Sequence, residues 1–332
     1  MYAKTVNDAF RYFINEEINL DATVVDRARE SRDNLLSNIL DFDGDDDFFS
    51  LYPEVNIQFG SFARGTKLRP LDDIDIMIGL SAKGCTYDAS LGWNKIRMSA
   101  RTDDVRLLAC AEDGFLNSTK VINRIIKKLR SLKDYCRSDL HKNQQAAVLN
   151  LLSKEWSFDI VPCFYTKPEA DGRDYYLIPN GNGDWMKTDP VRDKDVLLGE
   201  NARLEGRLKL LIRLMKKWNR VKKVKTLPSY ALETLIINRY KKESNISEFP
   251  DIELRYCLNK FSSDVCQPIQ DIKEIQGDLN ELSYSEKQDN ARRAKNDCDK
   301  AQQAWEYEKS GNQETAINLW REIFGEDFPQ YG

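Results

Sequence analysis

The spacing of apolar and polar positions divides the chain into two parts with different predicted secondary structure. In the first part, segments rich in Ile, Val and Phe predict three strands, at 55–59, at 74–80 and over the run "SFDIVPCFY" that begins at Ser157. Beyond Pro179, apolar residues recur at helical spacing over 203–221, 229–242, 252–261, 284–308 and "ETAINLWREIF". The pattern therefore predicts an α+β lobe followed by a helical lobe.

Helices are also predicted around the strands of the first lobe. Residues up to Ile39 have apolar positions at helical spacing, with Asp21 as an N-cap, which predicts one or two helices there. The run "STKVINRIIKKLRSLKDY" predicts an amphipathic helix that starts near Ser118. The run "IPNGNGDWMKTDP" is rich in Gly, Asn and Pro and predicts a loop. We place the lobes at 1–180 and 181–332, on either side of the start of this loop.

Length and apolar content bound the class of protein. With 332 residues and 41% apolar side chains, the chain can bury a core large enough for two lobes. Its apolar runs stop well short of the roughly 20 residues of a membrane span. The first residues lack the apolar region and cleavage site of a signal peptide. We therefore expect a cytoplasmic protein that does not bind a membrane.

Charge and histidine content exclude further functions. The net charge of −4 lacks the basic excess typical of proteins that bind long nucleic acids, and it favours small charged substrates. The seven cysteines are scattered without a C-x-x-C pair, so we expect reduced thiols. The single histidine, His141, lies among polar residues and is read as a solvated loop residue. Catalysis through a Ser-His-Asp or Cys-His arrangement is therefore disfavoured.

Two carboxylates alternate with isoleucines in the second predicted strand. Because successive side chains of a strand point to opposite faces, Ile74, Ile76 and Ile78 would enter one layer while Asp73 and Asp75 share the other face. Two neighbouring carboxylates repel one another unless a cation lies between them. Mg²⁺ suits such a pair because it prefers oxygen ligands and shares its shell with substrate phosphates.

Asp159 repeats this pattern in "FDIVP", within the third predicted strand. If that strand lies beside the second, three carboxylates converge, as a two-metal site for phosphoryl transfer requires. Asp159 would then bind the metal that activates the attacking hydroxyl and would help to accept its proton. Asp72 should face the other way and is left out.

Gly60 and Ser61 follow the first predicted strand. A glycine at this place lets the backbone approach a ligand closely, and a helix that begins at Ser61 would aim N–H groups and a hydroxyl at an anion. The pair therefore predicts a phosphate-binding turn of a different design from the G-x-x-x-x-G-K-[ST] loop, which the chain lacks.

These segments resemble a known superfamily. "GSFARGTKLRPLDDIDIMI" with "FDIVP" resembles the DNA polymerase β-like nucleotidyltransferases, and within them the cyclic GMP-AMP synthase/DncV-like nucleotidyltransferases (CD-NTases) and their oligoadenylate synthase relatives. The resemblance covers most of the chain, and "AINLWREIFGEDFP" is similar to the C-terminal helix and tail of bacterial anti-phage members. It implies a mixed sheet in the first lobe and a helical lobe that closes the nucleotide cleft.

The resemblance also implies roles for residues of the helical lobe. In "LIRLMKKW", Lys216 would contact the triphosphate; in "PSYALETLI", Ser229 would touch phosphate and Tyr230 would stack on a nucleobase. From the residues themselves, Lys216 lies near the edge of an apolar helix face and Tyr230 lies at a helix start. A solvated lysine and a packing tyrosine remain alternatives.

The implied activity is a Mg²⁺- or Mn²⁺-dependent transfer that joins nucleoside triphosphates into a cyclic di- or trinucleotide second messenger and releases pyrophosphate. The substrates would be ATP, GTP and, as alternatives left open, UTP or CTP, with Asn180 and Asn182 as candidate base readers or plain loop residues. The family also implies a role in anti-phage defence and a regulator or ubiquitin-like ligase encoded nearby. The ligase would act at Gly332, although a chain end without function explains that glycine equally well.

The chain differs from the animal members of this family, and two alternative functions remain open. The chain lacks the His/Cys cluster of the zinc-binding thumb in cyclic GMP-AMP synthase, and its net charge argues against activation by a long duplex. One rival is a linear-oligonucleotide or RNA-directed nucleotidyltransferase, which should add a basic groove or an aromatic platform. The other is an inactive scaffold, which should have lost a carboxylate.

Overall fold

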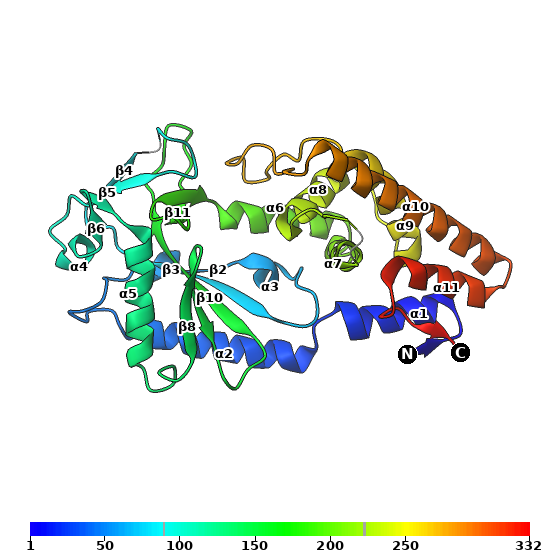
Figure 1. Cartoon of the computed structure of the whole chain (residues 1–332), viewed down its shortest axis with the longest axis horizontal. Coiled ribbons are helices and arrows are strands. Elements are labelled where there is room, and N and C mark those ends of the chain that lie inside the picture. Colours follow the sequence, from blue (N-terminus) through cyan, green and yellow to red (C-terminus); the bar gives the residue numbers. More distant parts are fainter. Residues whose placement is uncertain (89, 222–223) are drawn as a thin grey trace. The chain divides into compact units, whose positions relative to one another are not determined.

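Two groups of elements pack separately in the structure, a computed structural model that describes residues 1–88, 90–221 and 224–332 (Figure 1). The sheet unit consists of Ala22–Arg64 and Leu71–Asp193. The helical unit consists of Met1–Asp21, Gly65–Pro70 and Lys194–Gly332. The helical unit thus takes in two N-terminal segments, and it begins after Asp193, whereas the sequence analysis divided the chain at residue 180.

The sheet unit is built on a mixed sheet in which β10 is the central strand. The strands follow the order β12-β11-β10-β3-β2, and β9 pairs with both β10 and β8. β10 runs parallel to β3 and antiparallel to β9 and β11. The strand bounds are Ile57–Gln58 (β2), Asp73–Gly79 (β3), Asp139–Asn143 (β8), Ala146–Asn150 (β9), Ser157–Tyr165 (β10), Tyr176–Pro179 (β11) and Trp185–Thr188 (β12).

Helices and a second sheet complete this unit. Helix α5, Ser118–Ser131, packs against β8 to β11 and buries Val121, Ile122 and Ile125 (Figure 1). It begins where predicted because Asn117 caps its first turn by accepting hydrogen bonds from the N–H groups of Thr119 and Lys120. The other helices are α2 (Ala22–Leu40), η2 (Pro53–Val55), α3 (Gly60–Arg64) and α4 (Val105–Leu108). The second sheet contains β4 (Thr86–Asp88), β5 (Arg97–Ser99), β7 (Phe115–Leu116) and β6 (Ala111–Glu112).

The predicted strands at 74–80 and from Ser157 are confirmed as β3 and β10, but the first predicted strand is largely wrong. Pro53–Val55 forms a 3₁₀ turn and only Ile57–Gln58 joins the sheet. The predicted loop "IPNGNGDWMKTDP" contains the β11–β12 hairpin, because Gly181 and Gly183 turn the chain at positive φ and bring Trp185 into the core. His141 lies on strand β8 rather than in a loop, and its side chain is 48% exposed.

The helical unit surrounds one apolar core that includes Trp218, Leu232, Phe261 and Trp320. The predicted helix at 203–221 is interrupted: Glu205 and Gly206 have positive φ and separate α6 from α7. The bounds are Val6–Phe13 (α1), Ile14–Ile18 (η1), Pro190–Arg203 (α6), Leu208–Arg220 (α7), Ser229–Tyr240 (α8), Pro250–Asp264 (α9), Tyr284–Lys309 (α10) and Gln313–Phe324 (α11). The first residues of α6, up to Asp193, belong to the sheet unit.

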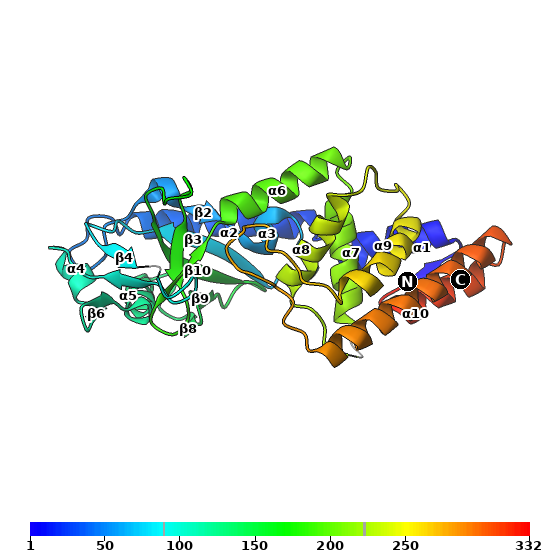
Figure 2. The ribbon, with the colours of Figure 1, turned by 90° about the horizontal axis from the view of Figure 1, so that it is seen from above.

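Both ends of the chain pack into the helical unit. β1, Tyr2–Ala3, pairs in parallel with β13, Gln330–Tyr331, and Figure 2 shows the two termini side by side. Phe10 of α1 makes an edge contact with Trp320 of α11, at 4.8 Å between ring centroids. These contacts explain why the first residues belong to this unit. Of the helices within the described residues, none is long and apolar enough to cross a membrane.

A buried ion pair holds Gly65–Pro70 in the helical unit. The Lys216 ammonium of α7 donates to Oε1 of Glu233 in α8 at 2.7 Å and to the Thr66 carbonyl oxygen at 3.0 Å. The Thr66 hydroxyl donates to Oε2 of Glu233 at 3.0 Å. Lys216 and Glu233 are 4% and 2% exposed, and Leu68 is fully buried in the core. The segment between α3 and β3 is therefore part of the helical core.

Replacing Glu233 with Ala should lower the free energy of unfolding by about 3–5 kcal/mol, because it leaves the Lys216 charge buried without its carboxylate. Denaturant unfolding followed by circular dichroism measures the loss. Asp299→Ala is the matched control, since its i,i+4 pair with Lys295 is more than half exposed and should contribute less than about 0.5 kcal/mol. Equal small losses in both variants would show that the buried pair does not anchor the segment.

Candidate active site

Three carboxylates lie on one face of two adjacent strands. In the parallel pairing of β3 and β10, Asp159 is the register partner of Asp75, and Ser157 is the partner of Asp73. Register partners of parallel strands point to the same face, and neighbouring strands lie about 4.8 Å apart. The strand adjacency on which the predicted convergence of Asp73, Asp75 and Asp159 depended is therefore present.

This face changes from acidic to apolar along the strands. After the carboxylates come Met77 on β3 and Val161 and Cys163 on β10, which are buried in one cluster with Val148. Asp73, Asp75 and Asp159 themselves are only partly buried. The carboxylates thus lie at the start of both strands, where the sheet face leaves its core.

The opposite face of the same strands explains their fixed register. Ile74, Ile76, Phe158 and Ile160 are at most 1% exposed. A slip of one residue would turn these side chains outward and the carboxylates inward, so burial of the isoleucines and the phenylalanine holds the aspartates on their side. Asp72, outside β3, is exposed, and its carbonyl oxygen accepts the Ser157 N–H at 3.0 Å.

Gly60 lies directly against Asp75. It begins the short helix α3 with φ of +73°, and a Cβ built on it would overlap the Asp75 carboxylate at Oδ2 and Cγ. A backbone hydrogen bond also connects the residue before Gly60 to β3: the N–H of Phe59 donates to the Asp75 carbonyl oxygen at 3.4 Å. Only glycine fits between α3 and β3, both because of the space and because of the backbone conformation. Ser61 follows it and is partly exposed.

The other end of α3 is also fixed. Arg64 forms an ion pair with Asp193, and each of the two residues is 8% exposed. Both groups are thus desolvated together, which makes their separation costly. The helix that carries Gly60 and Ser61 is therefore held at the glycine by close packing and at the arginine by charge.

The donor set of this face suits a hard divalent cation. Asp73, Asp75 and Asp159 offer only carboxylate oxygens, the ligands that Mg²⁺ prefers. Within the described part of the chain, no three His, Cys, Asp or Glu side chains are gathered closely enough to hold an ion by themselves. Mg²⁺ commonly completes such a partial shell with water and substrate phosphates, so the residues fit an ion that arrives with its nucleotide.

The predicted residues of α8 lie at its first turn. Ser229 is the first residue of α8, after Pro228, and it is exposed. Tyr230 is partly buried, and its hydroxyl donates to Oδ1 of Asp271 at 2.9 Å. The ammonium of Lys273 lies 4.2 Å from the centre of its ring. Contacts of Ser229 and Tyr230 with a nucleotide stay predictions.

Lys216 is buried between α7, α8 and the 65–70 segment, whereas the sequence predicted that it lies at the edge of a helix face. Its ammonium is buried against Glu233 and the Thr66 carbonyl oxygen, because α8 and the 65–70 segment cover that side of α7. The geometry gives Lys216 an anchoring role. Its contact with a triphosphate stays a prediction.

Two further cationic residues of α7, Arg213 and Lys209, lie one and two turns before Lys216, and the sequence alone did not single them out. The Arg213 guanidinium donates to the Gly65 carbonyl oxygen at 2.6 Å, and the Lys209 ammonium would lie 3.7 Å from a Cβ at Gly65. Burial, and then the charges of Arg213 and Lys194, lower the pKa of Lys209; burial lowers the pKa of Arg213. Their i, i+4, i+7 spacing with Lys216 was a signal that could have identified this cationic face.

The remaining candidates have local structural partners. The side-chain amide of Asn180 donates to the Asn94 carbonyl oxygen, and its Oδ1 accepts the N–H of Asn182, as in a turn that closes a hairpin. His141 lies 3.3 Å from an Asp139 carboxylate oxygen on an exposed strand face. The N–H of Gly332 donates to the Ala3 carbonyl oxygen at 3.2 Å.

Comparison with solved structures identifies the fold. The chain is similar to CdnC of E. coli MS115-1, in a complex with HORMA-deltaN and with ATP, with TM-scores of 0.72 and 0.71, 16% identity, and coverage of 97% of this chain and 98% of that one. It is also similar to the Vibrio cholerae DncV cyclic AMP-GMP synthase, with a TM-score of 0.58, 13% identity, and coverage of 83% and 69%. The predicted α+β, polymerase β-like fold with a mixed sheet and a C-terminal helical region is confirmed.

Sequence comparison identifies the family. No model of a known protein family matches the chain. The chain is 35% identical, over 330 residues and 99% of both sequences, to a probable cyclic nucleotide synthase of Bacillus cereus strain VD146. On this identity and on the shared fold, the chain belongs to the cyclic GMP-AMP synthase/DncV-like nucleotidyltransferases, enzymes that make cyclic oligonucleotides.

Proposed function

We propose that the protein joins nucleoside triphosphates into a cyclic di- or trinucleotide second messenger and releases pyrophosphate, with Mg²⁺ or Mn²⁺ as cofactor. The observation that carries the proposal is the register of β3 and β10, which puts Asp159 beside Asp75 on the face that also bears Asp73. The fit of Gly60 against Asp75 supports it, because it connects the proposed phosphate-binding turn to the carboxylates.

Each bond-forming step is a transfer of a nucleotidyl group. The hydroxyl oxygen of the acceptor nucleotide attacks the α-phosphorus of the donor, and the bond from that phosphorus to the bridging oxygen of the β-phosphate breaks. Pyrophosphate leaves with the bridging oxygen. Asp159 accepts the proton of the attacking hydroxyl. Repetition on the linear product, with its own terminal hydroxyl as acceptor, closes the ring and releases a further pyrophosphate.

The protein contributes mainly position and charge to this reaction. Asp73 and Asp75 would hold both metal ions, and Asp159 the one nearer the acceptor. The bound ions would neutralise the triphosphate and lower the pKa of the attacking hydroxyl. Gly60 and Ser61 would bind the donor phosphates through backbone N–H groups and the serine hydroxyl. Such a mechanism needs no histidine, in agreement with the single exposed His141.

Residues of the helical unit are also proposed to contact nucleotide. Ser229 would touch phosphate, and Tyr230 would stack on the base. Lys209 and Arg213 would add positive charge where the segment after α3 enters this unit, and Lys216 would hold that segment through Glu233. Relatives guide the choice of bases: CdnC has a structure with ATP, and DncV has structures with GTP and 3′-deoxy ATP. We therefore propose ATP and GTP as substrates.

We also propose that the product acts in anti-phage defence and that a partner protein controls the enzyme. The support is the resemblance to bacterial defence enzymes and the complex of CdnC with HORMA-deltaN. Conjugation at Gly332 by a ligase would use the carboxylate of the residue whose N–H donates to the Ala3 carbonyl oxygen. Mass spectrometry of the protein after coexpression with its genomic neighbours tests the conjugation, and an unmodified Gly332 would count against it.

Incubation with the four α-³²P-labelled triphosphates and Mg²⁺ or Mn²⁺ should yield a phosphatase-resistant species, because a cyclic product has no terminal phosphate. Mass spectrometry of that species identifies its bases and ring size, and a pyrophosphate assay gives the stoichiometry. Phosphatase removes terminal phosphates and leaves phosphodiester links intact, so a linear product would also keep internal label. A resistant species with the mass of an open chain with free hydroxyl ends, one water heavier than the ring, would instead indicate a linear-oligonucleotide or RNA-directed enzyme.

Asp75→Asn and Asp159→Asn should each lower the rate of pyrophosphate release by at least about 100-fold, since each removes an anionic oxygen donor that the reaction centre needs. Asp72→Asn is the matched control, because Asp72 adjoins the same strand outside the acidic face, and it should retain activity. Thermal unfolding should be similar in all three. Near-wild-type activity of either site variant would remove the assignment.

Gly60→Ala should abolish activity, because its Cβ would displace the Asp75 carboxylate as well as strain the backbone. Gly172→Ala separates these two effects: Gly172 has a similar φ of +77°, but nothing lies within 4 Å of the added Cβ. That control should lose a little stability and keep its rate. If both variants lost activity equally, the close approach of Gly60 to Asp75 would have no catalytic meaning.

A further inference from the structure

The loop between α9 and α10, residues 265–283, is folded by its own polar side chains. The Asn280 amide donates to the carbonyl oxygens of Val265 and Gln267, at 2.8 and 2.9 Å. Oδ1 of Asp278 accepts the N–H groups of Ile269 and Asn280, at 2.7 and 2.8 Å. A loop with this many internal hydrogen bonds has one defined conformation and can carry side chains at fixed places.

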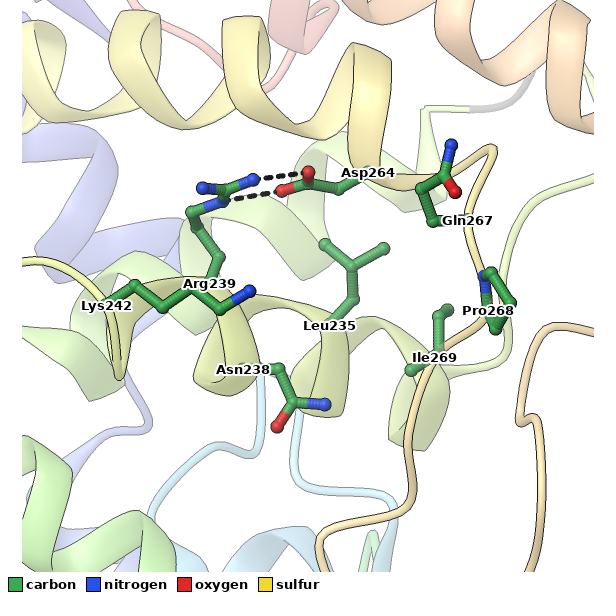
Figure 3. Close-up of a pocket in the computed structure, with 8 residues that line it drawn as sticks. All are labelled: Leu235, Asn238, Arg239, Lys242, Asp264, Gln267, Pro268 and Ile269. Atoms are coloured by element: carbon green, nitrogen blue, oxygen red, sulfur yellow. Dashed lines mark hydrogen bonds and ion pairs between the residues drawn. The ribbon is translucent and has the colours of Figure 1, made fainter.

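The base of this loop is tied to α8. Arg239 of α8 forms a double hydrogen bond with Asp264 at the end of α9, and the Asn238 amide donates to the Gln270 carbonyl oxygen at 2.8 Å. Figure 3 shows the paired Arg239 and Asp264 beside a pocket that Asn238 of α8 and Ile269 of the loop also line. α8 also carries Tyr230, so the loop and the tyrosine share one rigid support.

Asp271, in the middle of the loop, is the group that connects it to Tyr230. The residue is 5% exposed, and its carboxylate accepts four hydrogen bonds. Three come from the backbone N–H groups of Lys273, Ile275 and Gln276, at 3.0 to 3.2 Å. The fourth comes from the Tyr230 hydroxyl, at 2.9 Å. The backbone donors fix the carboxylate, and the carboxylate fixes the hydroxyl end of the ring.

Lys273 holds the same ring from its face. The ammonium lies 4.2 Å from the ring centre, within the range of a cation–π contact, and the residue is 7% exposed. Because Asp271 binds the Lys273 N–H, one short turn of chain controls both the tilt and the hydroxyl position of the ring. A ring held in advance loses less conformational entropy when a ligand stacks on it.

We propose that Asp271 is a positioning residue that acts through the Tyr230 hydroxyl and, with Lys273, holds the ring ready to stack on the base of a nucleoside triphosphate. The inference rests on the nucleotide-binding role proposed above for Tyr230. The inference adds that the α9–α10 loop contributes to binding of the base, whereas other residues bind the phosphates. Asp271 therefore affects binding of a base and leaves binding of a bare triphosphate unchanged.

The test is a double-mutant cycle with Tyr230→Phe and Asp271→Asn. Tyr230→Phe removes the donor of the hydrogen bond between ring and loop. Asp271→Asn weakens the acceptor, because the negative charge is lost and one oxygen becomes an N–H₂ group that faces hydrogen-bond donors. Each should therefore raise the KM for ATP roughly 3- to 10-fold with kcat nearly unchanged, as for a contact made equally in ground and transition states. The double variant should show no further rise, because both changes break the same contact. Calorimetry should show weaker binding of a non-hydrolysable ATP analogue by the same factor and unchanged binding of inorganic tripolyphosphate.

Asp278→Asn is the matched control. Asp278 also accepts two backbone N–H groups of the loop, but it makes no hydrogen bond to Tyr230. It should leave the KM for ATP unchanged, and its effect on thermal unfolding should match that of Asp271→Asn. The comparison therefore separates support of the ring from general stability of the loop.

The outcomes distinguish this inference from the proposed function. If the wild-type protein binds the ATP analogue, and Asp271→Asn behaves like Asp278→Asn or weakens tripolyphosphate equally, Asp271 does not position the ring and the inference is overturned. If the wild-type protein binds neither the analogue nor tripolyphosphate, the proposed function fails and the inference fails with it. A base-dependent, non-additive loss in the cycle supports both.

Discussion

The structure depends on the parallel register of β3 and β10. Burial of Ile74, Ile76, Phe158 and Ile160 on one face sets this register, and the other face then presents Asp75 and Asp159 as direct neighbours. A shift by one residue would expose the apolar side chains and bury the carboxylates, at a cost far larger than any local gain. The hydrophobic core thus supplies the energy that keeps like charges together.

The charges are kept at the sheet face by close packing as well. Gly60 leaves no room between α3 and Asp75, and the Arg64–Asp193 pair holds the far end of the same short helix. A five-residue helix has little stability of its own, so these contacts determine where its first turn lies. The groups proposed to bind phosphate and metal are separate in the sequence and are therefore packed against one another in the fold.

The connection from α3 to β3 belongs to the helical unit. Thr66 and Leu68 are buried there, and Lys216 and Glu233 clamp the Thr66 backbone and hydroxyl. The chain between the glycine turn and the acidic strand is thus built into a core that also contains α7 and α8.

Local chemistry in the sequence was sufficient for the strands at 74–80 and from Ser157, the helix from Ser118, and the helices beyond residue 229, because strong apolar periodicity sets their type. It also singled out Asp73, Asp75 and Asp159 as candidate metal ligands, because carboxylates stood among isoleucines and phenylalanine in predicted strands, and that role stays a prediction. It did not reveal the β8–β9 and β11–β12 hairpins, whose strands are only four or five residues long.

Only the tertiary structure decided which groups meet. The pairing of Asp159 with Asp75, the overlap that forbids a side chain at Gly60, and the contact of Asp271 with Tyr230 join residues that lie far apart in the sequence. The burial of Lys216 likewise depends on a helix and a segment that no local pattern places beside it. Local sequence records what each residue prefers, whereas long-range packing determines the partner that satisfies the preference.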